Sequence, residues 1–259
     1  MISSDWILAL VAFAASMLTF FSGFGLGTLL LAFMLIYFPP EIAVGITAIV
    51  HLVNNVFKWF LTRKNIDAGL VWAFGLPAIV GALLGAFVLQ YLNNIQPLFQ
   101  YELYNKAHSI TLIKVVVGVV MILFILWEWL PGVNRLQFRS SFMRIGGFIT
   151  GFFGGLSGHQ GALRSAFLAK GELDKETFIS TGVAIACLID ISRIQYYARH
   201  FNSLHVANHK AVILFCIVAA ISGSVAGNLW LKKVTETFIQ TTVAIMVLIM
   251  ALLLITGIL

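Results

Sequence analysis

Polar side chains interrupt the apolar segment 41–61 at regular intervals. Steps of three, four and seven residues place them on one face of an α-helix. Hydroxyl, imidazole, amide and ammonium groups are costly in an apolar environment, so this face must line a cavity or bond a neighbouring helix. Lys58, five residues before Arg63, has the alternative of extending its ammonium group to the cytoplasmic interface. The residues are Thr47, His51, Asn54, Asn55 and Lys58.

A second charged pair lies in the apolar segment 177–198. Asp190 and Arg193 are three residues apart, so they can pair on one helix. In one interpretation the pair is structural and locks neighbouring helices. In the other, Asp190 fixes Arg193 so that the rest of its planar five-donor group receives an oxyanion.

Glycines and polar residues alternate within residues 154–165, which read Gly-Gly-Leu-Ser-Gly-His-Gln-Gly-Ala-Leu-Arg-Ser. Glycine permits a sharp turn, and a short helix starting near Gln160 would direct the positive end of its dipole at that turn. Ser157, His159 and Gln160 add side-chain donors. Such a turn suits a small anion, and Arg164, one helical turn later, faces the cavity or the membrane surface.

Proton transfer has three candidate groups. An unperturbed histidine titrates near pH 6.5, so His51 or His159 could carry a coupled proton, and Asp190 is the third candidate. A histidine inside a membrane is as often only a hydrogen-bond donor. The spacing of three further histidines, His200, His205 and His209, is only a weak signal for a metal site. No metal or cofactor is expected.

The composition places these groups inside a membrane. Of the 259 residues 60% are apolar and 10% charged, and the mean hydropathy is +0.98, whereas soluble domains carry about a quarter charged residues. The chain is long enough for about eight spans and no sizeable extramembrane domain. The net charge of +6 is scattered at the ends of apolar segments, a pattern that sets orientation and predicts no nucleic-acid partner.

The apolar segments define the expected helices. Six are long enough to span alone, whereas 25–38 and 160–169 are too short and follow glycines, which indicates broken or re-entrant helices. The first segment has no preceding Lys or Arg and is expected to be a retained helix, not an export signal. The segments are 6–22, 25–38, 41–61, 68–91, 110–130, 142–156, 160–169, 177–198, 210–231 and 237–258.

Two glycine-rich breaks reveal an internal repeat. Residues 20–27 align with 152–158, and at an offset of 135 Glu41 falls on Glu176, Asn55 on Asp190 and Lys58 on Arg193. Paired discontinuous segments in two halves indicate a transporter whose site lies at the repeat interface. The expected halves are 1–131, with the broken segment 6–38, and 141–259, with the broken segment 142–170, joined by the linker 132–140.

Basic residues predict the orientation. If each broken pair enters the membrane and returns, nine basic residues lie on one side of the membrane and four on the other. If each pair crossed only once, the basic residues would be divided nearly evenly. The fold class is therefore all-α: a polytopic membrane bundle with two re-entrant hairpins, two repeats of inverted topology and both termini outside. The basic side holds Arg63, Lys64, Arg135, Arg139, Arg144, Lys170, Lys175, Lys232 and Lys233; the other holds Lys106, Lys114, Arg199 and Lys210.

These features resemble the sulfite exporter TauE/SafE family of membrane permeases. Residues 23–27 followed by 43–47 look like its first signature, and residues 151–168 look like its second. Members commonly have a glycine triplet followed by a proline-containing segment, whereas this chain has Gly158-His159-Gln160-Gly161 followed by Arg164. The resemblance implies export of sulfite or small organosulfonates, linked to the proton gradient.

The predicted function is a multi-pass secondary transporter in the cell membrane, which for a prokaryotic protein is the bacterial plasma membrane, and it exports a small oxyanion by alternating access. A path for a cation or neutral metabolite is the alternative, and a homodimer is left open. No His-Glu-x-x-His or Gly-x-Ser-x-Gly pattern occurs, so no enzyme is expected. The predicted anion-binding residues are Gly25, Gly27, Thr28, Asn54, Asn55, Lys58, Ser157, Gly158, Gln160, Gly161, Arg164 and Arg193.

Overall fold

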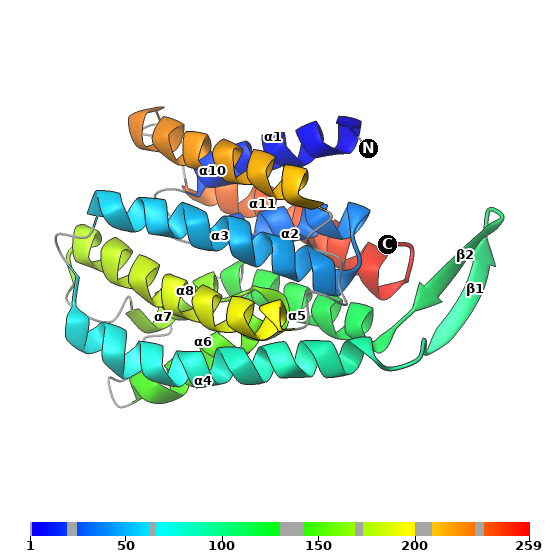
Figure 1. The fold of residues 1–259 in the computed structure, drawn as a ribbon, viewed down its shortest axis with the longest axis horizontal. Helices are drawn as coiled ribbons and strands as arrows, with labels where there is room; N and C mark the ends of the chain where they lie inside the picture. The colour runs from blue at the N-terminus through cyan, green and yellow to red at the C-terminus, as the bar shows by residue number, and fades with distance from the viewer. Residues whose placement is uncertain are drawn as a thin grey trace.

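The computed structural model is a bundle of helices with one β-hairpin projecting from one end, near both chain termini (Figure 1). It describes residues 2–19, 25–62, 66–129, 142–168, 173–199, 209–230 and 236–259. Gly23, one of the predicted break residues, lies outside these ranges. The first-half elements are α1 (Ile2–Leu18), α2 (Leu26–Tyr37), α3 (Pro40–Thr62), α4 (Ala68–Asn93), β1 (Phe99–Leu103), β2 (Lys106–Ile110) and α5 (Leu112–Trp129). The second-half elements are α6 (Met143–Ser157), α7 (Gly161–Leu168), α8 (Lys175–Ala198), α10 (Lys210–Trp230) and α11 (Glu236–Ile255).

The helices follow the apolar segments of the sequence and confirm the helical membrane fold class. Within the described part of the chain, four helices are long and apolar enough to cross a membrane: Pro40–Phe60, Ala68–Asn93, Glu176–Ala198 and Lys210–Gly227. The other two predicted spans are represented by shorter apolar helices, Leu112–Trp127 and Ala244–Ile255. The count of about eight spans stays a prediction.

Both predicted breaks separate a pair of helices. Gly25 precedes α2 with φ of 109°, and Gly158 ends α6 with φ of 79°, a left-handed conformation that glycine adopts without steric cost. The short helices α2 and α7 begin 135 residues apart, and so do the long helices α3 and α8 that follow them. The offset read from the sequence therefore applies to the helix boundaries themselves.

Helix α6 packs in parallel on α4 through backbone-to-backbone contact. A Cβ atom on Gly151 would overlap the Ala78 carbonyl group, and one on Gly155 would overlap that of Ala82. Contacts therefore advance along both helices together, so α6 enters the bundle from the end at which α4 begins. Helix α7 returns to that end, where α8 begins.

Helix α1 makes the corresponding contact with α10. Trp6 stacks on Phe215 with ring centroids 5.3 Å apart, and Gly223 lies against the backbone of Phe13. These contacts also advance in parallel, so α1 enters from the end at which α10 begins, opposite to α6 (Figure 1). Each broken hairpin thus packs on a helix from the other half of the chain.

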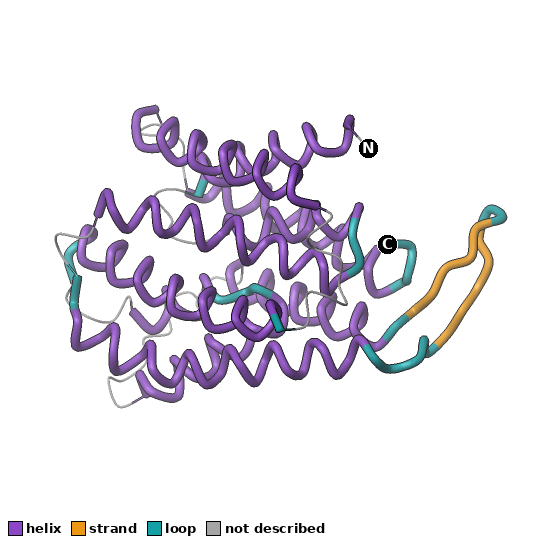
Figure 2. The backbone as a smooth tube through the Cα atoms, in the orientation of Figure 1, coloured by secondary structure: helices purple, strands orange, loops and turns teal. Residues whose placement is uncertain are grey.

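The β-hairpin is an element for which the sequence predicted no structure. Strands β1 and β2 pair antiparallel, with Phe99 opposite Ile110 and a turn at Tyr104 and Asn105 (Figure 2). The Tyr101 hydroxyl group donates to the Thr256 carbonyl oxygen at 2.7 Å. The hairpin is thereby tied to the C-terminal segment.

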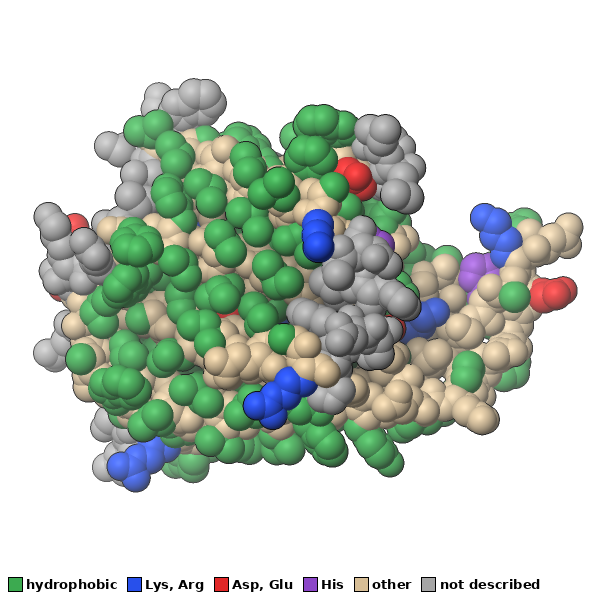
Figure 3. All heavy atoms as spheres, viewed as in Figure 1, with side chains coloured by type: hydrophobic (Ala, Val, Ile, Leu, Met, Phe, Trp, Pro, Cys, Tyr) green, Lys and Arg blue, Asp and Glu red, His purple; other side chains and the backbone are tan. Residues whose placement is uncertain are grey.

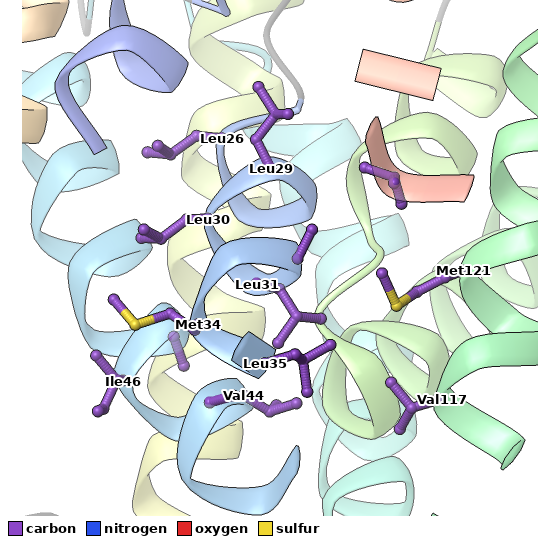
Figure 4. Packing of buried hydrophobic residues seen from close by; sticks show 14 of the residues in the cluster. Leu26, Leu29, Leu30, Leu31, Met34, Leu35, Val44, Ile46, Val117 and Met121 are labelled. Carbon is purple, nitrogen blue, oxygen red and sulfur yellow. The ribbon is translucent and has the colours of Figure 1, made fainter. Parts of the chain in front are cut away.

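Apolar side chains form both the interior and the outer surface. Leu30 and Met34 of α2 pack towards Ile46 of α3 inside the bundle (Figure 4). Hydrophobic side chains also cover much of the visible face (Figure 3). On α4, Trp72 and Val80 are more than half exposed, as suits a lipid-facing helix.

Candidate functional site

The two glycine breaks meet in the middle of the bundle. A Cβ atom on Gly27 would lie 3.5 Å from Cδ2 of His51 and 3.6 Å from the Gly158 carbonyl oxygen. His51 lies halfway along α3, so the meeting point is far from both ends of that helix. Gly27 of α2 therefore lies in contact range of both α3 and the α6–α7 turn.

Two short helices start at this meeting point. The first turn of α2 contains Gly27 and Thr28, and α7 starts at Gly161, three residues after the turn glycine. The first N–H groups of a helix lack intrahelical acceptors, and the helix dipole makes this end positive. The α6–α7 turn therefore lies beside the donor-rich ends of two helices.

Asp190 is the hub of the polar contacts around the breaks. Its Oδ2 accepts from Nδ1 of His51 at 2.6 Å, and its Oδ1 accepts from Nε2 of Gln160 at 2.9 Å. Nε and Nη2 of Arg193 donate to the same Oδ1 at 3.0 and 2.7 Å. One fully buried carboxylate thus joins α3, α8 and the turn before α7.

Arg193 is held at all three guanidinium nitrogens. Besides its two bonds to Asp190, its Nη1 donates to the Gly154 carbonyl oxygen at 3.0 Å. Gly158 lies beside the same nitrogen, which would be 3.3 Å from a Cβ atom at that position. This geometry matches the structural interpretation of the pair, in which Asp190 and Arg193 lock α8 to the break.

The remaining turn residues brace the loop between α6 and α7. Nδ1 of His159 lies 3.0 Å from the Ser157 carbonyl oxygen, to which it donates. Its ring stacks on Phe124 of α5, with centroids 5.6 Å apart. Nε2 of His159 and Oε1 of Gln160 are buried and have no hydrogen-bond partner among the described residues, so each has hydrogen-bonding capacity left for a ligand or water.

The two predicted asparagines have separate surroundings. Nδ2 of Asn55 lies 3.0 Å from Nδ1 and 3.3 Å from Nε2 of His51, which places it beside the Asp190 hub. Oδ1 of Asn54 instead accepts from Ser16 of α1 at 3.2 Å and from Ser224 of α10 at 2.7 Å. Asn54 thus joins α1, α3 and α10 and is separate from the Asp190 contacts.

Lys58 and Arg164 lie toward the end of the bundle at which α3 ends and α8 begins, which we call the basic end. Both side chains are buried. Arg164 lines a pocket with Ser165 and Leu168 of α7 and with Phe178, Ile179 and Gly182 of α8.

The buried charges of the described residues are predominantly positive. Lys58, Arg164 and Arg193 are buried, against the single buried carboxylate of Asp190. These four ionised side chains carry a net charge of +2. A net charge of this kind is costly inside a membrane unless an anion or water compensates it.

Comparison with known proteins assigns the family. The chain matches the sulfite exporter TauE/SafE family over residues 8–254. The chain belongs to the sulfite exporter TauE/SafE family. No match was found among curated proteins or among solved structures.

Family membership confirms the resemblance and the broad functional class. The protein is a membrane transporter of sulfite or related anions and is not an enzyme. The match covers both glycine breaks and all the charged groups described above.

Three side chains that make buried hydrogen bonds in this region were not predicted from the sequence. Ser16 and Ser224 bond each other and Asn54, and the Tyr197 hydroxyl group donates to the Gly155 carbonyl oxygen. Single hydroxyl groups in apolar segments are too common to stand out. A weak signal was available for Ser224, since it lies in the small polar run Ser222-Gly223-Ser224.

Proposed function

We propose that the protein exports sulfite or a small organosulfonate by alternating access, with the anion bound between the two glycine breaks. The observation that carries this proposal is the pair of helix N-termini near one turn, with the buried cations Lys58 and Arg164 on the side of that turn toward the basic end. A small anion compensates both features.

The cations have different roles in this proposal. Arg193 donates from all three nitrogens to protein oxygens, so it positions Asp190 and the α6–α7 turn. Lys58 and Arg164 supply the charge that the anion balances. The N–H groups of Gly158 and Gln160, the Ser157 hydroxyl group and the Gln160 amide already donate to protein oxygens. In this proposal the N–H groups from Gly25 to Thr28, those of His159 and Gly161, and the Asn55 amide would contact the anion.

Alternating access follows from the arrangement of the halves. The α1–α2 and α6–α7 hairpins enter from opposite ends and pack on α10 and α4, which correspond in the repeat order. We interpret this exchange as an inverted repeat, in which rocking of the two parts opens the central site to one end and then the other.

Proton coupling is assigned to His51. It lies between Asp190 and Gly27, so its ring touches both the buried carboxylate and the break that binds the anion. Protonation of His51 would add a positive charge beside the anion, so the anion and the proton would bind and leave together. They would cross in the same direction, and the outward gradient of the anion would drive the export of both.

Flux measurements test this function. Proteoliposomes containing the purified protein should take up labelled sulfite and move protons measurably with it, and an imposed pH gradient should change the initial rate. Liposomes without protein are the control. Absence of flux for sulfite and for methanesulfonate, with and without the gradient, would contradict the proposal.

The alternative path for a cation is not favoured by the contacts. The carboxylate that would balance a cation, Asp190, already accepts from His51, Gln160 and Arg193, and the acceptor oxygen left at Gln160 carries no charge. Replacing Lys58 with Gln separates the two functions, because an anion carrier should lose binding and a cation path should not.

A further inference from the structure

Two buried polar atoms lie at the turn between α6 and α7. Nε2 of His159 and Oε1 of Gln160 have no hydrogen-bond partner among the described residues, and the two residues are only 3% and 1% exposed. Buried polar atoms in proteins are nearly always hydrogen-bonded. Whether these two atoms are donors or acceptors decides which ligand suits them.

The surroundings of His159 fix which ring nitrogen carries the hydrogen. Nδ1 lies 3.0 Å from the Ser157 carbonyl oxygen, which can only accept, and 3.1 Å from Oγ of Ser157. The Ser157 hydroxyl hydrogen is donated to the Phe153 carbonyl oxygen, so Oγ is an acceptor here as well. Nδ1 is therefore the donor, and Nε2 of the neutral ring is an acceptor.

The orientation of the Gln160 amide is fixed in the same way. Its nitrogen lies 2.9 Å from Oδ1 of Asp190, a carboxylate that pairs with Arg193 and therefore only accepts. The NH2 group must face Asp190, which leaves Oε1 as the other end of the amide. Both of the buried atoms at this turn are thus acceptors.

An acceptor beside an oxyanion needs an explanation, because the lone pairs of the two repel each other. The conflict is removed if the anion itself carries a hydrogen. Hydrogensulfite, the monoanion with one protonated oxygen, combines negative oxygens with an O–H donor. A cation would also bring a donor, but the buried Lys58, Arg164 and Arg193 oppose a further positive charge.

We infer that the anion between the glycine breaks binds as hydrogensulfite, with Nε2 of His159 accepting its O–H hydrogen. Oε1 of Gln160 is a second acceptor in the same turn. The inference rests on the proposed function for the place at which the anion binds. It adds that the sulfite dianion, and sulfonates without a donor of their own, bind more weakly.

Binding of two matched anions tests this requirement. Methanesulfinate has the charge and pyramidal shape of hydrogensulfite, with a methyl group in place of the hydroxyl group. Calorimetry on the purified full-length protein in detergent, at a pH at which hydrogensulfite predominates, measures both affinities. We expect hydrogensulfite to bind about tenfold more tightly, because methanesulfinate leaves the His159 acceptor unpaired.

The pH dependence supplies a second test. As the pH rises above the pKa of hydrogensulfite, sulfite becomes a dianion and its affinity should fall, whereas methanesulfinate keeps its charge. The affinity for methanesulfinate therefore reports any titration of the protein itself. The titratable side chains described on the elements around the turn include His51 and Lys58 of α3, Arg164 of α7, and Cys187, Asp190, Arg193 and Tyr197 of α8.

Variants of His159 identify the acceptor. Asparagine at this position can still donate to the Ser157 carbonyl oxygen but has no atom at the place of Nε2, so His159→Asn should remove the preference for hydrogensulfite. Unchanged methanesulfinate binding would show that this variant is folded. Glutamine reaches further with a carbonyl oxygen, so His159→Gln should restore part of the preference. His108→Asn, on the β-hairpin, is the control and should leave both affinities unchanged.

Three results would overturn the inference: equal affinities for the two anions, a preference that survives His159→Asn undiminished, or a sulfite affinity that rises with pH. If sulfite is transported in any of these cases, the proposed function stands. If neither anion binds and no flux is found, the proposed function fails and the inference fails with it.

Discussion

The two halves of the protein place different chemistry at equivalent helix positions. In α8, Asp190 precedes Arg193 by three residues and binds it; in α3, Asn55 precedes Lys58 by the same interval. The two helices begin 135 residues apart, and the charges at these two pairs of positions differ. Asp190 pairs with Arg193 in α8, whereas the residue three positions before Lys58 in α3 is an amide, so two helices with matching starts carry different charge at these positions.

Removing the carboxylate of the second half should have the largest effect. Asp190→Asn leaves Arg193 buried without its counter-ion, so we expect a loss of about 3–5 kcal/mol in unfolding free energy. Titration with a denaturing detergent measures it. Asp67→Asn is the control, because an asparagine still caps α4 at its exposed start. Equal stability of the two variants would show that Asp190 is not the hub described above.

Replacing Lys58 and Arg193 one at a time should distinguish an effect on anion binding from an effect on stability. Lys58→Gln should weaken sulfite binding by about tenfold, or 1.4 kcal/mol, with little change in unfolding. Arg193→Gln should instead lower stability, because it breaks the contacts to Asp190 and Gly154. Calorimetric binding and unfolding curves on the same samples measure both. The opposite assignment of effects would reverse the roles proposed for the halves.

Making the first half resemble the second should also weaken the site. In Asn55→Asp the new carboxylate can pair with Lys58 three residues later, so sulfite binding should weaken by roughly threefold to tenfold. Asn55→Ala controls for loss of the amide without added charge. Tighter binding in the aspartate variant than in the alanine variant would contradict the role of positive charge.

The difference between the N-terminal ends of α3 and α8 should have the smallest effect on stability. Helix α3 begins at Pro40, whereas α8 has Asp174 as its N-cap. The Thr177 backbone N–H and hydroxyl group donate to the Asp174 carboxylate and hold its pKa below the ordinary value of 3.8. The stability from this cap is therefore complete above pH 3.8 and is lost as the pH falls through the lowered pKa.

Replacing this cap should give a small effect that depends on pH. Asp174→Ala should unfold slightly more easily than the natural chain near neutral pH, and the difference should narrow as the solution is acidified below pH 4. Parallel detergent unfolding curves at several pH values measure it. A difference that widens on acidification would contradict the cap.

The helices and their breaks could be predicted from the sequence because hydrophobic length and glycine act locally. The contact between His51 and Asp190 could not, since it depends on how α3 packs on α8, 139 residues away. Sequence reasoning left Arg193 with two roles, and only its bond to the Gly154 carbonyl oxygen favours one of them. The β-hairpin was missed because its short, largely exposed strands have no sustained apolar pattern.

The location of a bound oxyanion tests the central claim most directly. Crystals soaked with selenite, a heavier analogue of sulfite, would reveal the anion by the anomalous scattering of selenium. We predict a peak between the first turn of α2 and the start of α7, near Gly27 and Gly158. Flux measurements should first show that the protein transports selenite. A selenium peak elsewhere in the bundle, with none between the breaks, would then contradict the proposed site.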